Sequence, residues 1–399
     1  MQSSEPQSND TRPPSRIKAT TSAQIVTAES VEAEEVPTIP IGSMQTVSAL
    51  QPEVAVHELT TPSSARLPVP LIVHPAEYRR SPGEWLRIWW NGMRPSYLPL
   101  SLLPVLLGSV LAWTQSISTS AFRGSFHPQR FAVLLLAVIF LQIGANLVND
   151  YYDYLRGIDA TNSLGPGGLI QQGFIRPVRV LTIGMTMLGL GVLCGLLLII
   201  SSGGLLMLGA VLLGLFCAYF YSATAHSLSA IALGELFSFA TFGPVLTLTA
   251  FYAQTGQISQ PVFIYSLPLG LLACAFIFLN NMRDRESDTQ AGKHTLASLL
   301  GLRLSRVMYL LLLLGAYAPI VALAIPRHAP HLLLITLWTL PGLVVLLSGV
   351  FRTYTPASLH WHMRKTLSLE IQFALLLMIA LIVTAYVTLL RLPTFTLPF

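Results

Sequence analysis

The sequence predicts an all-α protein that crosses a membrane many times. Of its 399 residues, 53% are hydrophobic and only 10% are charged, whereas about 25% of residues are charged in an average soluble domain. The mean hydropathy is +0.62. After Ser81, nine apolar stretches are each long enough to cross a bilayer, which takes about 20 residues of α-helix. These observations place the chain in the polytopic membrane class.

The first 80 residues differ from the rest in composition. They are rich in Ser, Thr, Pro, Gln and Glu and show no sustained hydrophobic periodicity. Such a segment buries too little apolar area to offset the entropy lost on ordering. We therefore expect residues 1–80 to be a disordered N-terminal extension and residues 81–399 to be the transmembrane domain. No basic region followed by an apolar core occurs in the extension, so it does not resemble a signal peptide.

The transmembrane domain begins with a short amphipathic segment. Residues 83–92 contain Trp85, Trp89 and Trp90, and tryptophan favours the membrane interface, so we expect an interfacial helix here. Nine transmembrane spans are predicted to come after it, at approximately 96–115, 131–153, 178–201, 203–222, 231–253, 261–283, 304–325, 331–350 and 367–390.

Lysine and arginine are distributed unequally between the two sides of the predicted bundle. The segment before the first span and the loops on the same side carry 15 of them from Arg79 onward, and the other side carries four. The positive-inside rule then predicts a multi-pass protein of the cell membrane with its N-terminus in the cytoplasm and its C-terminus outside. No basic run interleaved with aromatic residues is present, so nucleic acid is not an expected partner. The sequence does not indicate a protein partner.

Acidic side chains are scarce after residue 80 and are concentrated in two places. Residues 81–399 contain nine, and six of these lie in the stretches 146–159 and 280–288. Both stretches come at the predicted cytoplasmic end of a span. Each places an asparagine four residues before an aspartate on one helix face, with Asn146, Asp150 and Asp153 in the first and Asn280, Asp284 and Asp288 in the second.

These two acidic clusters indicate a shared metal site. A carboxylate near a bilayer is costly to keep, so its presence favours a function. Magnesium prefers oxygen ligands, commonly one or two carboxylates together with phosphate oxygens. Arg156, Arg283 and Lys293 flank the clusters and would neutralise a diphosphate, whereas a cation pathway would avoid such positive charge at its mouth. A transporter pathway and a pair of solvated helix ends remain as alternatives.

Other polar residues have less specific interpretations. Tyr219 and Tyr221 end the fourth span, where a phenol either contacts a phosphate or carbocation or anchors the helix at the interface. We expect Glu370 to lie in the first turn of the ninth span and to complement the helix N-terminus. We expect His360 and His362 to lie in a solvated loop.

Four segments carry a resemblance to a known family: Arg94-Pro95 with 104–108, 146–159, 234–236 with 242–244, and 280–297. Residues from about 94 to 390 resemble the UbiA superfamily of intramembrane aromatic prenyltransferases. Within it they resemble the 1,4-dihydroxy-2-naphthoate polyprenyltransferases of menaquinone synthesis. Many members of the superfamily have a third aspartate four residues after the position of Asp153. This chain has Gly157 there and an acid at Asp159, which is the form of the naphthoate subgroup.

The resemblance implies nine helices around a central cavity with both acidic clusters at its mouth. It implies an isoprenyl diphosphate bound through Mg²⁺, and prenyl transfer to the aromatic acceptor 1,4-dihydroxy-2-naphthoate with loss of CO₂ and a proton. The isoprenoid tail would extend toward membrane lipid. Acceptors such as 4-hydroxybenzoate or homogentisate are alternatives. Carried over to this sequence, the resemblance implies metal ligands at Asp150, Asp153, Asp284 and Asp288, catalytic roles for Asp150, Asp153, Tyr221 and Asp284, and substrate contacts from Asn146, Asn149, Arg156, Asp159, Asn280, Arg283 and Lys293.

Overall fold

The computed structural model describes residues 80–118, 126–157, 169–202, 204–221, 223, 227–326, 330–353 and 355–390. All of them belong to one unit, Arg66–Phe399. In these ranges the chain forms helices and no strand, which confirms the predicted all-α class. The predicted N-terminal extension lies outside the described residues, so the boundary at residue 80 stays a prediction.

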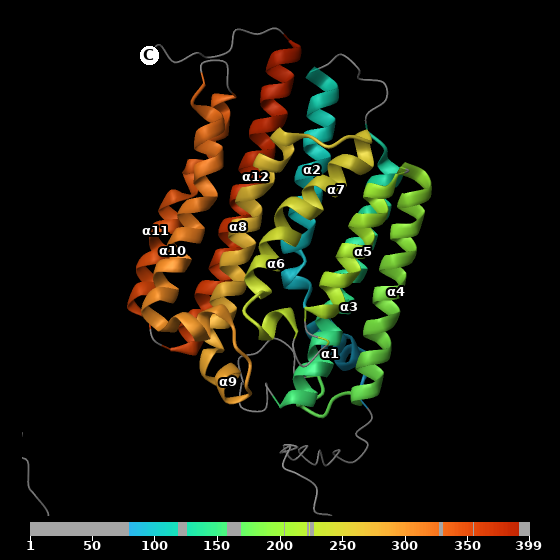
Figure 1. Cartoon of the computed structure of the whole chain (residues 1–399), viewed down its shortest axis with the longest axis vertical. Helices are drawn as coiled ribbons and strands as arrows, with labels where there is room; N and C mark the ends of the chain where they lie inside the picture. The colour runs from blue at the N-terminus through green and yellow to red at the C-terminus, as the bar shows by residue number, and fades with distance from the viewer. Residues whose placement is uncertain are drawn as a thin grey trace, which may run out of the picture. The chain divides into compact units, whose positions relative to one another are not determined.

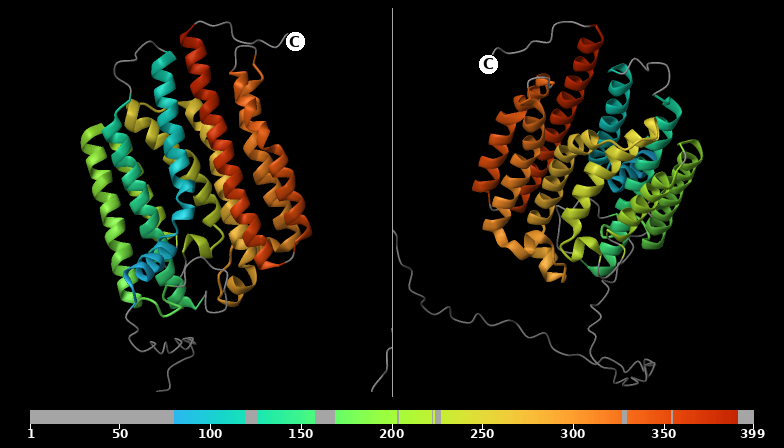
Figure 2. Two further views of the ribbon diagram at one scale, coloured as in Figure 1. Left: turned by 180° about the vertical axis from the view of Figure 1, so that it is seen from behind. Right: turned by 45° about the horizontal axis from the view of Figure 1, so that its top comes forward.

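The helices form a bundle in which the long segments lie side by side (Figures 1 and 2). In Figure 1, α4 stands at one edge of the bundle and α10 with α11 at the other. The helices are α1 (Pro82–Met93), α2 (Pro99–Ser118), α3 (Pro128–Arg156), α4 (Pro177–Ser202), α5 (Leu205–Phe220), α6 (Gly234–Ala240), α7 (Leu246–Thr255), α8 (Gln260–Arg283), α9 (Arg285–Gln290), α10 (Leu296–Ala324), α11 (Leu340–Arg352) and α12 (Pro356–Leu389). Shorter helical turns are η1 (Pro95–Tyr97), η3 (Leu228–Ala230), η4 (Thr241–Val245) and η5 (His331–Thr339).

Each of the nine predicted spans corresponds to an apolar helical segment of the described residues. Eight are long and apolar enough to cross a membrane, and two of these are composite: α6, η4 and α7 form one, and η5 with α11 forms another. The remaining segment, α5, has 16 residues. At 1.5 Å per residue it extends about 24 Å, which is less than the roughly 30 Å of a typical hydrocarbon core.

The helix α1 is confirmed and has a well-defined start. The Ser81 hydroxyl accepts a hydrogen bond from the Glu84 backbone N–H at 3.3 Å, and the Glu84 carboxylate accepts one from the Ser81 N–H at 2.7 Å. This capping box satisfies two backbone donors that the first turn would otherwise leave without partners. The helix buries Ile88 against the bundle and exposes Leu86 and Trp90, as expected of a helix that lies at a membrane surface.

The helix α8 occupies the middle of the bundle. It contacts α10, α12, α6 and α2, and most of its apolar side chains after the first turn are buried. A helix that is hydrophobic all round is stable in such a position because neighbouring helices cover every face. The second acidic cluster begins at its C-terminal end, so the cluster starts from a helix that its neighbours enclose.

The segment between α6 and α7 is a π-helical turn, η4, that contains Pro244. Proline has no N–H to donate, which disfavours a regular α-helix at this point. Gly243 of this turn lies against Gly270 of α8, where a Cβ on Gly243 would come 2.7 Å from the Gly270 Cα. Only glycine permits this approach, and it brings the turn against the central helix.

The start of α12 differs from the prediction. The sequence predicts a span from residue 367, but α12 begins at Pro356, so His360 and His362 lie on a helix and not in a loop. Glu370 is fully buried in the interior of α12, so its predicted place in a first turn is wrong. The first turns of α12 are polar, and hydropathy reports only the part of a helix that crosses the membrane.

Candidate active site

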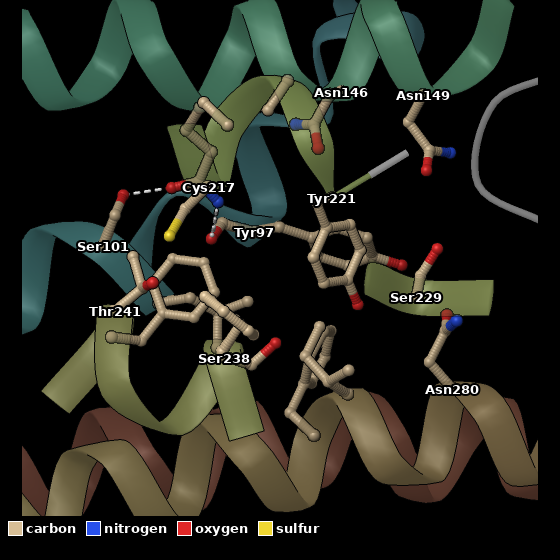
Figure 3. Close-up of a pocket in the computed structure, with 18 of the residues that line it drawn as sticks. Tyr97, Ser101, Asn146, Asn149, Cys217, Tyr221, Ser229, Ser238, Thr241 and Asn280 are labelled. Atoms are coloured by element: carbon tan, nitrogen blue, oxygen red, sulfur yellow. Dashed lines mark hydrogen bonds between the residues drawn. The ribbon is translucent and has the colours of Figure 1, made fainter. Parts of the chain in front are cut away.

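One cavity of about 230 Å³ lies between α2, α3, α5, α6, η4 and α8 (Figure 3). Its walls are apolar over much of their area, with Leu100, Leu141, Phe237 and Phe276 among them. Polar side chains gather toward the end where α3 and α8 terminate. Nine of the predicted site residues line it: Asn146, Asn149, Asp153, Tyr221, Asn280, Arg283, Asp284, Asp288 and Lys293.

The first acidic cluster lies on the last two turns of α3. Gly157, with φ of 69°, ends this helix directly after Arg156. Asp153 accepts a hydrogen bond from Asn149 Nδ2 at 2.6 Å, and Arg156 Nη1 lies 3.8 Å from its other oxygen. Asn146 donates to the Met93 carbonyl at 3.1 Å. Of the three residues that the sequence spacing predicts on one helix face, Asn146 and Asp153 therefore line the cavity.

Asp150 lies behind this face and not on the cavity wall. Its side chain is fully buried and forms an ion pair with Arg94, which does line the cavity. Arg94 has φ of 53°, in the left-handed region, and ends α1 there before the chain turns into η1. Arg94 thus stands between Asp150 and the cavity.

The second acidic cluster lies where α8 ends. Asp284 accepts a hydrogen bond from Arg283 Nε at 2.7 Å, and Asn280 Nδ2 lies 3.4 Å from its other oxygen. One helical turn further, Asp288 lies on the short helix α9 and is 1% exposed. Lys293 Nζ lies 3.3 Å from Asp288 Oδ1.

Lys293 connects the two clusters electrostatically. Burial alone would lower the pKa of this lysine, but the carboxylates of Asp288, Asp153 and Asp284 raise it above its usual value. Burial raises the pKa of Asp288 to about 6, although Lys293 opposes the shift. The loop that carries Lys293 is fixed by a hydrogen bond from the His294 N–H to the Ala230 carbonyl at 3.1 Å. Acids of both clusters therefore surround one ammonium group.

The two tyrosines considered from the sequence have different positions. Figure 3 shows the Tyr221 ring in the space between Asn149 on α3 and Asn280 on α8. The Tyr219 hydroxyl instead lies 3.4 Å from the Tyr152 hydroxyl, and Tyr219 is not a lining residue. Of this pair, Tyr221 is therefore the candidate for contact with substrate.

Besides Asp150, two predicted site residues are not among the described residues that line the cavity. Arg156 contacts Asp153 but does not line the cavity. Asp159 lies outside the described residues.

Comparison with known proteins identifies the family. A sequence model of the UbiA prenyltransferase family matches residues 101–369. The chain belongs to the UbiA prenyltransferase family. It is 31% identical over 300 residues to a 1,4-dihydroxy-2-naphthoate octaprenyltransferase of Bacillus subtilis, covering 75% of this chain and 94% of the relative. It is also 37% identical over 226 residues to UbiA prenyltransferase domain-containing protein 1 of Danio rerio, covering 56% of this chain and 65% of the relative.

A solved structure has the same fold. A UbiA homologue from Archaeoglobus fulgidus, bound to DMAPP and Mg²⁺, superposes with a TM-score of 0.51 at 18% identity, covering 75% of this chain and 99% of the homologue. The predicted UbiA-like fold is therefore confirmed. Family membership makes this UbiA protein a multi-pass membrane protein and a prenyltransferase.

The carboxylate oxygens of this UbiA cavity are of the chemical type that a magnesium ion prefers. Asp153, Asp284 and Asp288 line one end of the cavity, and among the described residues no hydrogen-bond donor reaches the buried Asp288 Oδ2. Across the described ranges no three His, Cys, Asp or Glu side chains form a closed metal-binding group. Mg²⁺ usually takes one or two protein carboxylates and completes its coordination with substrate phosphates and water, and carboxylates are the groups that this wall supplies.

Several residues of this UbiA cavity were not predicted as site residues. Gln142 Nε2 donates to the Tyr97 carbonyl at 2.9 Å, and its oxygen accepts a hydrogen bond from Ser101 (Figure 3). Thr241 lies on the opposite wall. These residues lie on apolar spans, where nothing in the sequence distinguishes an isolated polar residue of the site from any other. Arg94 could have been predicted, because Arg94-Pro95 belongs to the segments that resemble the family.

Proposed function

We propose that this protein transfers a polyprenyl group from an isoprenyl diphosphate to 1,4-dihydroxy-2-naphthoate, with loss of the carboxyl group, to give demethylmenaquinol for menaquinone synthesis. One observation carries the proposal: Asp153, Asp284, Asp288 and Lys293 converge at the polar end of an otherwise apolar cavity. The similarity to the Bacillus subtilis octaprenyltransferase supports the choice of acceptor.

The polar end is the proposed position of the donor diphosphate. Asp153, Asp284 and Asp288 would hold Mg²⁺ there, with Asp150 behind them as a further carboxylate. The bound ion would stabilise the negative charge that develops on the leaving diphosphate. Lys293, which keeps its positive charge beside these acids, would donate hydrogen bonds to the same oxygens. Asn146, Asn149 and Asn280 would orient the diphosphate through their amides.

The reaction then needs a water-free volume next to the diphosphate. The allylic C–O bond breaks, and its electron pair leaves with the diphosphate. The allylic cation is enclosed by Tyr221, Phe237 and Phe276, whose rings exclude water and present their negative faces. The electron-rich ring of the acceptor forms the new C–C bond, and its carboxyl group leaves as CO₂ and a proton. A carboxylate of the first cluster is our candidate to deprotonate a ring hydroxyl.

The membrane setting follows from the donor. A polyprenyl chain is apolar along its whole length, so the product would pass laterally into lipid. We further propose that the acidic mouth and the N-terminus face the cytoplasm and the C-terminus faces outside, because lysine and arginine are concentrated on the side of the mouth. Residues 1–80 would form an extension separate from the enzymatic domain 81–399.

The acceptor distinguishes this proposal from its nearest alternative. A UbiA enzyme could instead prenylate 4-hydroxybenzoate or homogentisate, and the name of the Danio rerio relative specifies no acceptor. Membranes that contain the protein are incubated with one polyprenyl diphosphate and each acceptor in turn. The products are identified by mass. We expect a prenylated, decarboxylated product from the naphthoate alone. A product from only another acceptor would refute the naphthoate assignment.

The same assay tests the metal site. Asp284→Asn and Asp150→Asn should each abolish Mg²⁺-dependent prenylation while membrane insertion is retained. Glu286→Gln is the matched control, because this neighbouring carboxylate is 86% exposed and should be dispensable. Full activity in both aspartate variants would contradict the site assignment.

A further inference from the structure

The guanidinium of Arg283 is enclosed by protein acceptors. Its side chain is 1% exposed. A guanidinium has five N–H donors and no acceptor. Nε donates to Asp284 Oδ1 at 2.7 Å, and Nη2 donates to Asp284 Oδ2 and to Asn280 Oδ1, the latter at 3.0 Å. Nη1 lies 2.9 Å from His360 Nδ1 and 3.8 Å from Met363 Sδ.

This arrangement uses all the donors of Arg283 inside the protein. A diphosphate oxygen would have to displace one of these acceptors before it could bind the guanidinium. The two parallel contacts with Asp284 form a bidentate pair, which fixes the orientation of the carboxylate as well as attracting it. The geometry therefore favours Arg283 as the residue that orients Asp284, in place of the direct diphosphate contact predicted from the sequence.

His360 completes the arrangement from another helix. It lies near the start of α12, which packs along α8. Because a guanidinium can only donate, Nδ1 of His360 must accept this hydrogen bond, so the ring is neutral and carries its proton on Nε2. The His360 ring thus accepts a hydrogen bond from Nη1 of Arg283, the nitrogen that Asp284 and Asn280 do not contact.

We propose that His360, acting through Arg283, is a positioning residue that sets the Asp284 carboxylate for metal binding. The inference rests on the proposed function, since it assumes that Asp284 is a metal ligand. Removing a residue that orients a metal ligand typically weakens metal binding 10- to 100-fold. His360 itself contacts neither metal nor substrate in this scheme.

The test separates the hydrogen bond from the shape of the ring. His360→Phe keeps a ring but removes the acceptor, and His360→Asn keeps an acceptor near the position of Nδ1 but removes the ring. Purified full-length protein in detergent is titrated with Mn²⁺ in the presence of geranyl diphosphate, and free Mn²⁺ is followed by electron paramagnetic resonance. His331→Phe is the matched control, because the His331 ring lies 2.8 Å from the Ala324 carbonyl and His331 does not line the cavity.

We expect His360→Phe to weaken Mn²⁺ binding about 10- to 100-fold, and His360→Asn and His331→Phe to bind nearly as tightly as the unaltered protein. In activity assays the phenylalanine variant should need more Mg²⁺ for half-maximal rate, with a smaller loss of rate at saturating Mg²⁺. If the phenylalanine variant does not fold, His360→Leu replaces it.

Two results would overturn the inference. One is unaltered Mn²⁺ affinity in His360→Phe. The other is a loss in His360→Asn as large as in His360→Phe, because this would indicate that the ring acts by packing. Failure of the unaltered protein to bind Mn²⁺ with geranyl diphosphate would instead refute the proposed function, so the two failures are distinguishable.

Discussion

Replacing Lys293 with methionine should destabilise the protein in a pH-dependent manner. Lys293 is 3.3 Å from Asp288, and the two side chains are 13% and 1% exposed. Methionine keeps most of the side-chain volume and removes the charge, so Asp288 is left as a buried carboxylate without its cation. Breaking a buried ion pair from one side typically costs about 3–5 kcal/mol. We expect a loss of this size in the free energy of unfolding at pH 8.

The loss should be smaller at pH 5. The pKa of Asp288 is raised from its usual value of 3.8 to about 6, so the folded state takes up this proton more readily than the unfolded state. The contribution of Asp288 to stability therefore falls as the pH rises between these two values. Removing Lys293 takes away a cation that lowers the pKa of Asp288. In the variant, the contribution of Asp288 to stability therefore continues to fall at higher pH. At pH 5 the variant can protonate Asp288 and avoid much of the cost.

Unfolding of metal-free protein in detergent micelles provides the assay, at pH 5 and pH 8. Lys365→Met is the control, because Lys365 lies over the Trp361 ring and does not line the cavity. The double variant Lys293→Met with Asp288→Asn should recover most of the loss at pH 8, since neither charge then remains. An equal loss for Lys293→Met at both pH values, with no recovery in the double variant, would refute the reasoning.

Two further predictions concern the metal site and the packing of the bundle. Mn²⁺ affinity should fall by up to about tenfold per pH unit below pH 6, because a proton competes with the ion for Asp288. Titrations from pH 5 to 7.5 test this. A pH profile identical to that of Asp288→Asn would contradict it. Gly108→Val should lower the free energy of unfolding by about 1–3 kcal/mol, because a Cβ at Gly108 would lie 2.2 Å from the Thr247 carbonyl oxygen. Gly189→Ala on α4 is its control, with nothing within 4 Å of the added Cβ, and equal melting temperatures for both glycine variants would argue against close packing of α2 on α7.

The fold was predictable from the sequence because apolar length decides where helices cross a membrane. Hydropathy located all nine spans to within a few residues, apart from the starts of α10 and α12. It could not show that η4 interrupts the fifth span or that α5 is short, since those features depend on backbone hydrogen bonds and packing. It also placed Glu370 wrongly, because the polar first turns of α12 resemble a loop when only hydropathy is considered.

The relative positions of the acidic residues were predictable only within one helix. The spacing of Asp150 with Asp153 is a property of α3 and can be read directly, whereas the helix that the sequence predicts through Asp288 is interrupted at Asp284, between α8 and α9. Contacts between segments cannot be read in this way. Arg94 and His360 reach Asp150 and Arg283 from other helices, and nothing in the spacing of one sequence indicates which distant residue will be the partner of a carboxylate.

The π-helical turn η4 contributes to the wall of the cavity but supplies none of its acidic residues. Thr241 and Phe242 of this turn line the wall away from the acids. Deleting one residue from such a turn restores a regular helix and rotates the next helical segment by about 100°. The side chains that the following segment presents to the cavity would then be exchanged together, while Asp153, Asp284 and Asp288 lie on other helices and would stay in place. If the proposed function holds, a change of one residue in η4 would alter the walls around the substrate and leave the acidic end unchanged.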